Sequence, residues 1–311
     1  MTSQDWRPCE IDPAGARAEA SPAGLVEFIT THDEGALLTE AKALVFRGFG
    51  IDTDTLEQVM DLLLPKRLAY VHGNSPRSKV GRNLYTSTEY PADQTISMHN
   101  ELSYLHRWPS RLLFFAAVAA ETGGATPVVD GAAWLAGIDP DVRSAFAGGV
   151  RYTQNLHGGA GFGKSWPDTF ETDERDRVDA HLAEAGAQWT WKADGGLRVS
   201  QTRPATVRHP DTGVEVWFNQ ADQWHPAGLG DGTAAALAEI MPADELPMSV
   251  TFADGSPIPA EYVTHVRDVG LRLAVDVDWR QGDLLLIDNV LVGHGRRPFT
   301  GARRVLVAMT D

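Results

Sequence analysis

Two short polar segments lie far apart in this chain, and each follows a stretch that is typical of a β-strand. The first contains His99, Asn100 and Glu101, and the second, at His294, comes after the apolar run 284–287. Side chains alternate between the faces of a strand, so His99 and Glu101 share a face. Two imidazoles and one carboxylate can bind one side of a metal ion such as Fe(II) and leave the opposite side open. A single site built from both segments requires a fold that brings the two strands together.

The His-x-Glu spacing is weak by itself, because a chain with 10 histidines and 42 acidic residues contains such triplets by chance. Two arginines strengthen the interpretation, since Arg303 and Arg304 open a further apolar strand soon after His294. An arginine can hold the far carboxylate of a dicarboxylic cosubstrate through paired hydrogen bonds. Neighbouring residues of a strand point to opposite faces, so at most one of the two can enter a pocket.

These segments and several others occur in the order found in one enzyme family. The chain resembles the TauD/TfdA-type family of Fe(II)- and 2-oxoglutarate-dependent dioxygenases. Within that family it is most similar to the clavaminate-synthase-like branch, which includes amino-acid hydroxylases of natural-product pathways. The similarity covers most of the chain, from FRGF at 46–49 to Met309. Its other pieces are HNELSY at 99–104, WP at 108–109, GGAT at 123–126, HPDTG at 209–213, VWFNQ at 216–220 and the stretch 288–309.

The resemblance implies a cofactor set and the residues that hold it. Three residues would bind Fe(II): His99, Glu101 and His294. Thr126 and an arginine of the pair Arg303 and Arg304 would hold the C5 carboxylate of 2-oxoglutarate, with O2 as the other cosubstrate. Arg304 is favoured, because the family's arginine is the second of such a pair.

Two positions narrow the chemistry that the resemblance implies. Related halogenases replace the metal carboxylate by a small residue, so the presence of Glu101 argues against halogenation. Sulfonate-using members carry another arginine where this chain has Ala308, which argues against an alkylsulfonate substrate.

Three further residues are candidates for contact with substrate: Ser103, Tyr104 and Arg203. Ser103 and Tyr104 directly follow Glu101, and Arg203 is a basic residue beside a predicted strand. Asp288 or Asn289 either accepts the second N–H of His294, as partners of metal-binding imidazoles do, or forms the turn that ends the strand.

Bulk properties exclude several classes of partner. The net charge is −15 and the sequence pI is about 5.0, so we expect no binding to nucleic acid or to anionic membrane surfaces. Cys9 is the single cysteine, which rules out an intrachain disulfide or a zinc site made of several thiolates. The first residues lack the pattern of a signal peptide, and no apolar run approaches the roughly 20 residues of a membrane span. We therefore expect a cytoplasmic protein.

The resemblance and the strand-rich second part of the chain predict a mainly β (α+β) fold, with a double-stranded β-helix (jelly-roll) core and flanking helices. Residues 1–20 are polar and read as a loose N-terminal arm, followed by a single domain over residues 21–311. Residues 155–170 contain a glycine-rich stretch and are predicted to form a lid loop over the pocket. Residues 231–240 are predicted to be helical.

The predicted function is Fe(II)- and 2-oxoglutarate-dependent hydroxylation of an aliphatic carbon. The substrate is expected to be an amino acid or amino-acid-derived metabolite, free or tethered to a carrier protein, in a biosynthetic pathway. Alternatives within the same cofactor chemistry are desaturation, cyclisation and epimerisation. Alternatives from other classes are a jelly-roll protein that binds a metal or ligand without redox chemistry, and a zinc hydrolase. The sequence leaves the oligomeric state open.

Overall fold

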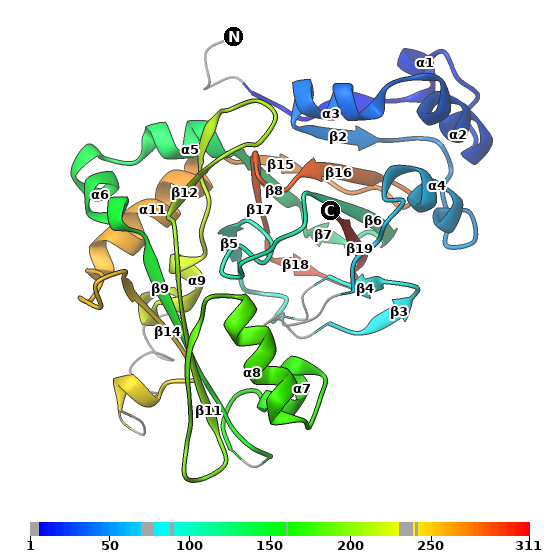
Figure 1. The fold of residues 1–311 in the computed structure, drawn as a ribbon. Helices are drawn as coiled ribbons and strands as arrows, with labels where there is room; N and C mark the ends of the chain where they lie inside the picture. The colour runs from blue at the N-terminus through cyan, green and yellow to red at the C-terminus, as the bar shows by residue number, and fades with distance from the viewer. Residues whose placement is uncertain (1–5, 70–76, 88–89, 160, 230–238, 240–241) are drawn as a thin grey trace.

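The computed structural model describes residues 6–69, 77–87, 90–159, 161–229, 239 and 242–311 (Figure 1). Its largest element is a seven-stranded sheet, here called the major sheet. The strands, in spatial order, are β1 (Cys9–Ile11), β2 (Ala43–Phe46), β16 (Leu284–Asp288), β6 (Arg111–Val118), β19 (Arg304–Thr310), β4 (Leu84–Thr86) and β3 (Lys79–Gly81). Only β1 and β2 are parallel; the other pairs that follow are antiparallel.

A four-stranded sheet, here called the minor sheet, shares a hydrophobic core with one face of the major sheet. Its strands, in spatial order, are β15 (Val275–Val277), β8 (Thr126–Asp130), β17 (Val292–Arg296) and β5 (Ile96–His99). Leu285 and Ile287 of β16 and Val128 of β8 are all in this core. Two sheets face to face are the arrangement that a double-stranded β-helix requires, and the predicted mainly β fold with flanking helices is confirmed.

The outer face of the major sheet is covered by helices, because its strands are apolar on both faces. Leu284 and Leu286 pack with Leu25 and Met60 in a second hydrophobic cluster, here called the outer cluster. The helices on this side are α2 (Pro22–Thr31), α3 (Glu34–Ala41) and α4 (Leu56–Leu63), seen in blue in Figure 1. Both faces of β16 are buried, which explains why its sequence is a continuous apolar run.

A third sheet extends away from the two others (Figure 1) and contains β10 (Gln188–Trp191), β11 (Leu197–Arg203), β9 (Val150–Leu156) and β14 (Met248–Phe252). Two short ribbons pair β12 (Thr206–Arg208) with β13 (Glu215–Trp217), and β18 (Phe299–Thr300) with β7 (Thr122–Gly123). The remaining α-helices of the described chain are α1 (Pro13–Ala16), α5 (Gly131–Gly137), α6 (Pro140–Ala145), α7 (Trp166–Phe170), α8 (Arg175–Glu184), α9 (Ala221–Trp224) and α11 (Ala260–Leu273). Short 3-10 turns cover Phe146–Gly148, Pro226–Leu229 and Ala243–Glu245.

The N-terminal segment differs from its prediction. The expectation of a loose arm over residues 1–20 is wrong for residues 9–16, because β1 pairs with β2 and α1 follows it. Ile11 is buried against the outer cluster, and the amide of Arg47 donates to its carbonyl. A three-residue strand is held by its neighbour in space, so local sequence pattern does not reveal it.

Residues 155–170 are only partly a loop. Their first residues end β9, and their last form α7, whose Trp166 is buried in a small cluster with Leu156 and Leu197. A lid formed by the residues between β9 and α7 stays a prediction. The predicted helix at 231–240 lies outside the described residues, apart from residue 239. Among the helices that the structure describes, none has both the length and the apolar character needed to cross a membrane.

Candidate active site

The register of the minor sheet brings the two histidines together. β5 and β17 are antiparallel neighbours, and His99 lies opposite His294 with their ring centroids 4.3 Å apart. Glu101 comes just after the end of β5, and its Oε2 is 3.9 Å from Nε2 of His294. All three residues are buried, and one potential ligand atom of each lies within 4.8 Å of the others. The structure thus assembles the three side chains predicted to bind metal.

The electrostatics of these residues suit a divalent cation. Burial lowers the pKa of His99, although Glu101 opposes part of this effect, and burial lowers the pKa of His294 well below its ordinary value. Both imidazoles are therefore neutral at neutral pH and keep a lone pair for a metal. Nδ1 of His99 lies 2.9 Å from the carbonyl oxygen of Ser97 and can donate to it, which leaves Nε2 as the ligand. Two neutral imidazoles and a carboxylate are the donor set of ferrous oxygenases, so the residues fit Fe(II).

The backbone of Glu101 is held by Asn289, a fully buried residue of the turn between β16 and β17. The amide of Glu101 donates to Oδ1 of Asn289 over 2.8 Å. The side-chain Nδ2 of Asn289 donates back to the carbonyl of Glu101 over 3.1 Å and to that of Pro109 over 2.8 Å. The turn that leads to His294 therefore also fixes the position of Glu101.

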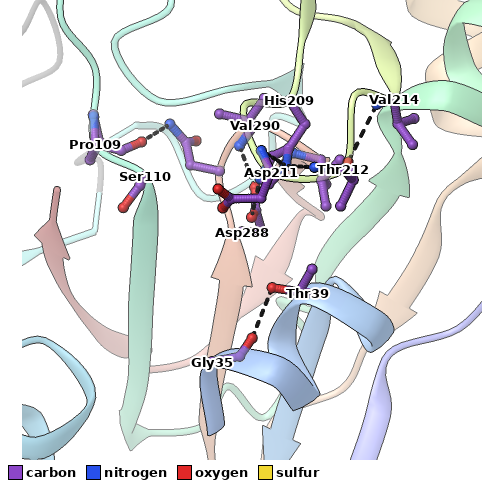
Figure 2. A network of polar contacts seen from close by, with 12 residues as sticks. Gly35, Thr39, Pro109, Ser110, His209, Asp211, Thr212, Val214, Asp288 and Val290 are labelled. Carbon is purple, nitrogen blue, oxygen red and sulfur yellow. Dashed lines mark hydrogen bonds and ion pairs between the residues drawn. The ribbon is translucent and has the colours of Figure 1, made fainter. Parts of the chain in front are cut away.

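Asp288 organises the same turn, as Figure 2 shows. Its Oδ1 accepts from the amides of Val290 and Leu291, each over 2.9 Å. Its Oδ2 lies 2.9 Å from Nε2 of His209, whose Nδ1 accepts from backbone amides, so Nε2 is the protonated atom and donates to Asp288. Asp288 and Asn289 thus shape the turn, and the described structure contains no hydrogen bond from either side chain to His294.

Thr126 and Arg303 lie next to the histidines. Both line a cavity of about 30 Å³ whose wall also includes His99 and His294. The side chain of Arg303 donates from Nε to the carbonyl of Gly124 over 2.9 Å. Burial lowers the pKa of Arg303 to about 10, so it remains a cation at neutral pH. A half-buried guanidinium that shares a cavity with a hydroxyl is well suited to bind a carboxylate.

The preference for Arg304 over Arg303 is wrong. Arg304 is exposed, whereas Arg303 lies on the same side as Val305 and Val307, which also line the cavity. The reason is the strand alternation, which sends consecutive side chains to opposite faces. The register of β19 against β6 also shifts between Arg304 and Val305.

The three candidate substrate residues lie elsewhere in the described structure. Ser103 is buried, and Tyr104 packs in an aromatic cluster with its ring centroid 5.0 Å from that of Trp224. Arg203 donates to Oε1 of Gln201 over 2.5 Å and to the carbonyl of Ala185 over 3.0 Å. None of the three lines the cavity beside the histidines. Their contact with substrate stays a prediction.

Two arginines near the site were not predicted. Nη2 of Arg77 is 2.6 Å from Oε2 of Glu101, and both side chains are buried. Arg296 donates to backbone carbonyls, including those of Tyr90 and Gln94. Arg77 lies in a polar stretch without strand or helix periodicity, so no local signal singles it out. Arg296 is close to His294 in the chain, and this proximity was the available signal.

A larger cavity of about 280 Å³ is lined in part by Leu102, the residue after Glu101. Apolar side chains from the segment between β5 and β6 form part of its wall: Leu102, Leu105 and Trp108. Two histidines, His106 and His181, also line it, and burial lowers the pKa of both. The cavity is large enough for a small metabolite.

Comparison with known proteins agrees with this geometry. The profile described as "Taurine catabolism dioxygenase TauD, TfdA family" matches residues 24–310. The dapdiamide synthesis protein DdaC of Enterobacter agglomerans is 38% identical over 296 residues, which are 94% of this chain and 89% of that protein. A clavaminate synthase-like protein of Arabidopsis thaliana is 30% identical over 317 aligned positions, covering 97% of this chain and 93% of that protein.

The fold is shared with a solved structure. PvcB, described as an Fe, alpha-ketoglutarate dependent oxygenase from an isonitrile synthetic pathway, superimposes with a TM-score of 0.51 at 15% identity. The superposition covers 97% of this chain and 86% of PvcB, and at that identity it concerns the fold alone. The family match and the two relatives show that the chain belongs to the TauD/TfdA family of Fe(II)- and 2-oxoglutarate-dependent dioxygenases.

Proposed function

We propose that this chain couples the oxidative decarboxylation of 2-oxoglutarate to hydroxylation of an aliphatic carbon in an amino acid or amino-acid-derived metabolite. The main support is the buried cluster of His99, Glu101 and His294 beside a cavity that contains Thr126 and Arg303. The name of DdaC, a dapdiamide synthesis protein, supports a role in a biosynthetic pathway. A carrier-tethered form of the substrate stays a prediction.

The roles of the residues follow from their chemistry. His99 and His294 would bind Fe(II) as neutral donors, and Glu101 would add the one negative charge. When bound, Fe(II) would supply the coordination sites at which O2, the oxidant, reacts with 2-oxoglutarate. The three ligand atoms lie within 4.8 Å of one another, and a set of three protein ligands would leave coordination positions for the reactants.

The second group of residues would orient the cosubstrate. Arg303 would pair with the C5 carboxylate of 2-oxoglutarate, and Thr126 would add a hydrogen bond to the same group. The hydroxyl of Thr126 is held in place by Nε1 of Trp279, which donates to it over 3.0 Å. The apolar side chains of Phe114 and Val307 form part of the cavity wall and would keep water from the reacting groups.

The test is formation of succinate from 2-oxoglutarate with Fe(II) and O2, in the presence of a panel of amino acids and their derivatives. We expect turnover by the unmodified protein and none by His294→Ala. His32→Ala is the matched control, because His32 is an exposed histidine at the end of α2 and should keep full activity. Absence of succinate with every substrate, despite intact metal binding, would favour a non-redox binding protein.

The products separate the remaining alternatives. Gain of one oxygen atom by the substrate identifies hydroxylation, whereas loss of two hydrogens identifies desaturation or cyclisation. An unchanged mass with inverted stereochemistry identifies epimerisation. Activity under strict anaerobiosis with Zn²⁺ would instead indicate a hydrolase.

A further inference from the structure

Arg77 makes an ion pair with one of the proposed metal ligands. Its side chain is 4% exposed, that of Glu101 is also 4% exposed, and Nη2 of Arg77 lies 2.6 Å from Oε2 of Glu101. The same oxygen is the one that lies 3.9 Å from Nε2 of His294. The guanidinium therefore contacts the oxygen atom of the carboxylate that faces the imidazoles.

The cavity beside the histidines is too small for the cosubstrate. Its volume is about 30 Å³, which leaves room for about two water molecules. A five-carbon dicarboxylate needs several times that space, so at least one side chain of the wall must move when it enters. Arg77 is part of this wall and is long and flexible. Arg296, another arginine of the wall, is tied to backbone carbonyls of residues 90 and 94.

Arg77 and a bound metal ion would repel each other, because both are positively charged. A guanidinium and a divalent cation that share one carboxylate oxygen would lie within about 5 Å of each other, where like charges repel strongly in a buried site. The two neutral imidazoles offer no negative charge to reduce this repulsion. Both cations therefore depend on the single negative charge of Glu101.

We propose that Arg77 is a positioning residue that competes with the metal for Glu101, and that its side chain withdraws from the carboxylate when the metal and 2-oxoglutarate bind. This inference rests on the proposed function, because it assumes that Glu101 is a metal ligand. The ion pair keeps the buried carboxylate neutralised, and it makes Arg77 a determinant of the affinity of the site for divalent cations.

The experiment is a titration with Mn(II) alone, followed by electron paramagnetic resonance of the free ion, so that the readout is metal binding and not turnover. We expect Arg77→Met to bind Mn(II) at least about tenfold more tightly than the unmodified protein, because a buried positive charge next to the site is removed. Arg77→Lys keeps the charge and should remain within about threefold. Arg303→Met is the matched control: it removes an equivalent charge from the same cavity without a contact to Glu101, and its affinity should change much less.

Equal or weaker Mn(II) binding by Arg77→Met would overturn the proposal, since Arg77 would then support the metal site instead of competing for it. Arg77→Gln removes the charge but keeps hydrogen-bond donors, and it provides the same comparison if the methionine variant does not fold. If the proposed function is wrong, the Mn(II) titration gives a different result. In that case the unmodified protein and His294→Ala would bind Mn(II) equally poorly.

Discussion

Arg303 and Thr126 reach the same cavity from opposite sheets. Thr126 begins β8 of the minor sheet, whereas Arg303 precedes β19 of the major sheet. Such a site needs no flexible loop to bring its charged group into place, because two packed sheets fix the separation of the two side chains. The Nε of Arg303 is bound to the carbonyl of Gly124, close in the chain to Thr126, and this contact orients the guanidinium further.

Substitution of the two neighbouring arginines should have unequal effects. Arg303→Ala should raise the KM for 2-oxoglutarate by roughly 10- to 100-fold, because a charge-assisted pair with the cosubstrate is lost. Arg304→Ala should change it by less than about twofold, since removal of an exposed charge has little effect. Succinate formation at increasing 2-oxoglutarate concentration measures both values. The reverse order of effects would show that the cosubstrate binds elsewhere.

The sequence could predict that one arginine enters a pocket but could not tell which. Strand alternation places Arg303 and Arg304 on opposite faces, yet the residues that follow, from Val305 to Met309, are apolar on both. Both faces are buried because helices cover one and the minor sheet covers the other. Because neither face of the strand is polar, the sequence does not show which face is exposed to solvent. The direction of each arginine side chain therefore depends on tertiary structure.

The turn between β16 and β17 connects the parts of the proposed metal site. Asn289 in this turn binds the backbone of Glu101, and the turn itself leads into the strand of His294. Asn100 strengthens the connection, because its Nδ2 donates to the carbonyl of Asn289 over 2.7 Å. A disturbance of the turn should therefore alter metal binding without removing any ligand.

Asn289→Ala should weaken metal binding. The change leaves the buried amide of Glu101 and two carbonyls without their partner, which should lower the free energy of unfolding by about 2–4 kcal/mol. Misplacement of Glu101 should also reduce Mn(II) affinity by at least about tenfold. Asn155→Ala is the control, because Asn155 is a buried amide that binds the carbonyls of Asp244 and Leu246 in another part of the fold. Equal metal affinity of the two variants would contradict the role of Asn289.

Elements with a simple pattern could be predicted from the sequence. The apolar runs of β16 and β19 indicate strands in the sequence, and the structure contains both. Strand β9 lacks such a pattern, because Thr153, Gln154 and Asn155 are polar although all three are buried. Their polar groups are compensated by specific partners, such as the hydroxyl of Ser200 for Thr153, and these partners are distant in sequence.

Segments from both ends of the chain meet in the major sheet. β1 and β2 come from the first residues, β16 and β19 come from the last, and β2 pairs directly with β16. The sequence alone contains no sign of this pairing, since long-range register is set by shared cores and not by local pattern. The family resemblance predicts the two-sheet architecture. It does not predict that residues 9–11 form an edge strand of the major sheet.

A substitution in β1 tests whether the N-terminal segment belongs to the folded body. Ile11→Ala should lower the free energy of unfolding by about 2 kcal/mol, because the side chain is buried in the outer cluster. Glu10→Ala is the control in the same strand and should cost less than about 0.5 kcal/mol, since its contact with Arg47 is partly exposed. Urea unfolding measures both. Equal stability of the two variants would instead support the expectation that residues 1–20 form a loose arm.

One buried site, formed by His99, Glu101 and His294 beside Thr126 and Arg303, is expected to bind Fe(II) and 2-oxoglutarate together. The most direct measurement is an anaerobic titration of the protein with both, monitored through the weak visible charge-transfer band of the chelate. We predict that the band appears with the unmodified protein, shifts when a substrate is added, and is lost in His294→Ala. Absence of the band with both ligands in excess would contradict the assignment of an oxygenase site.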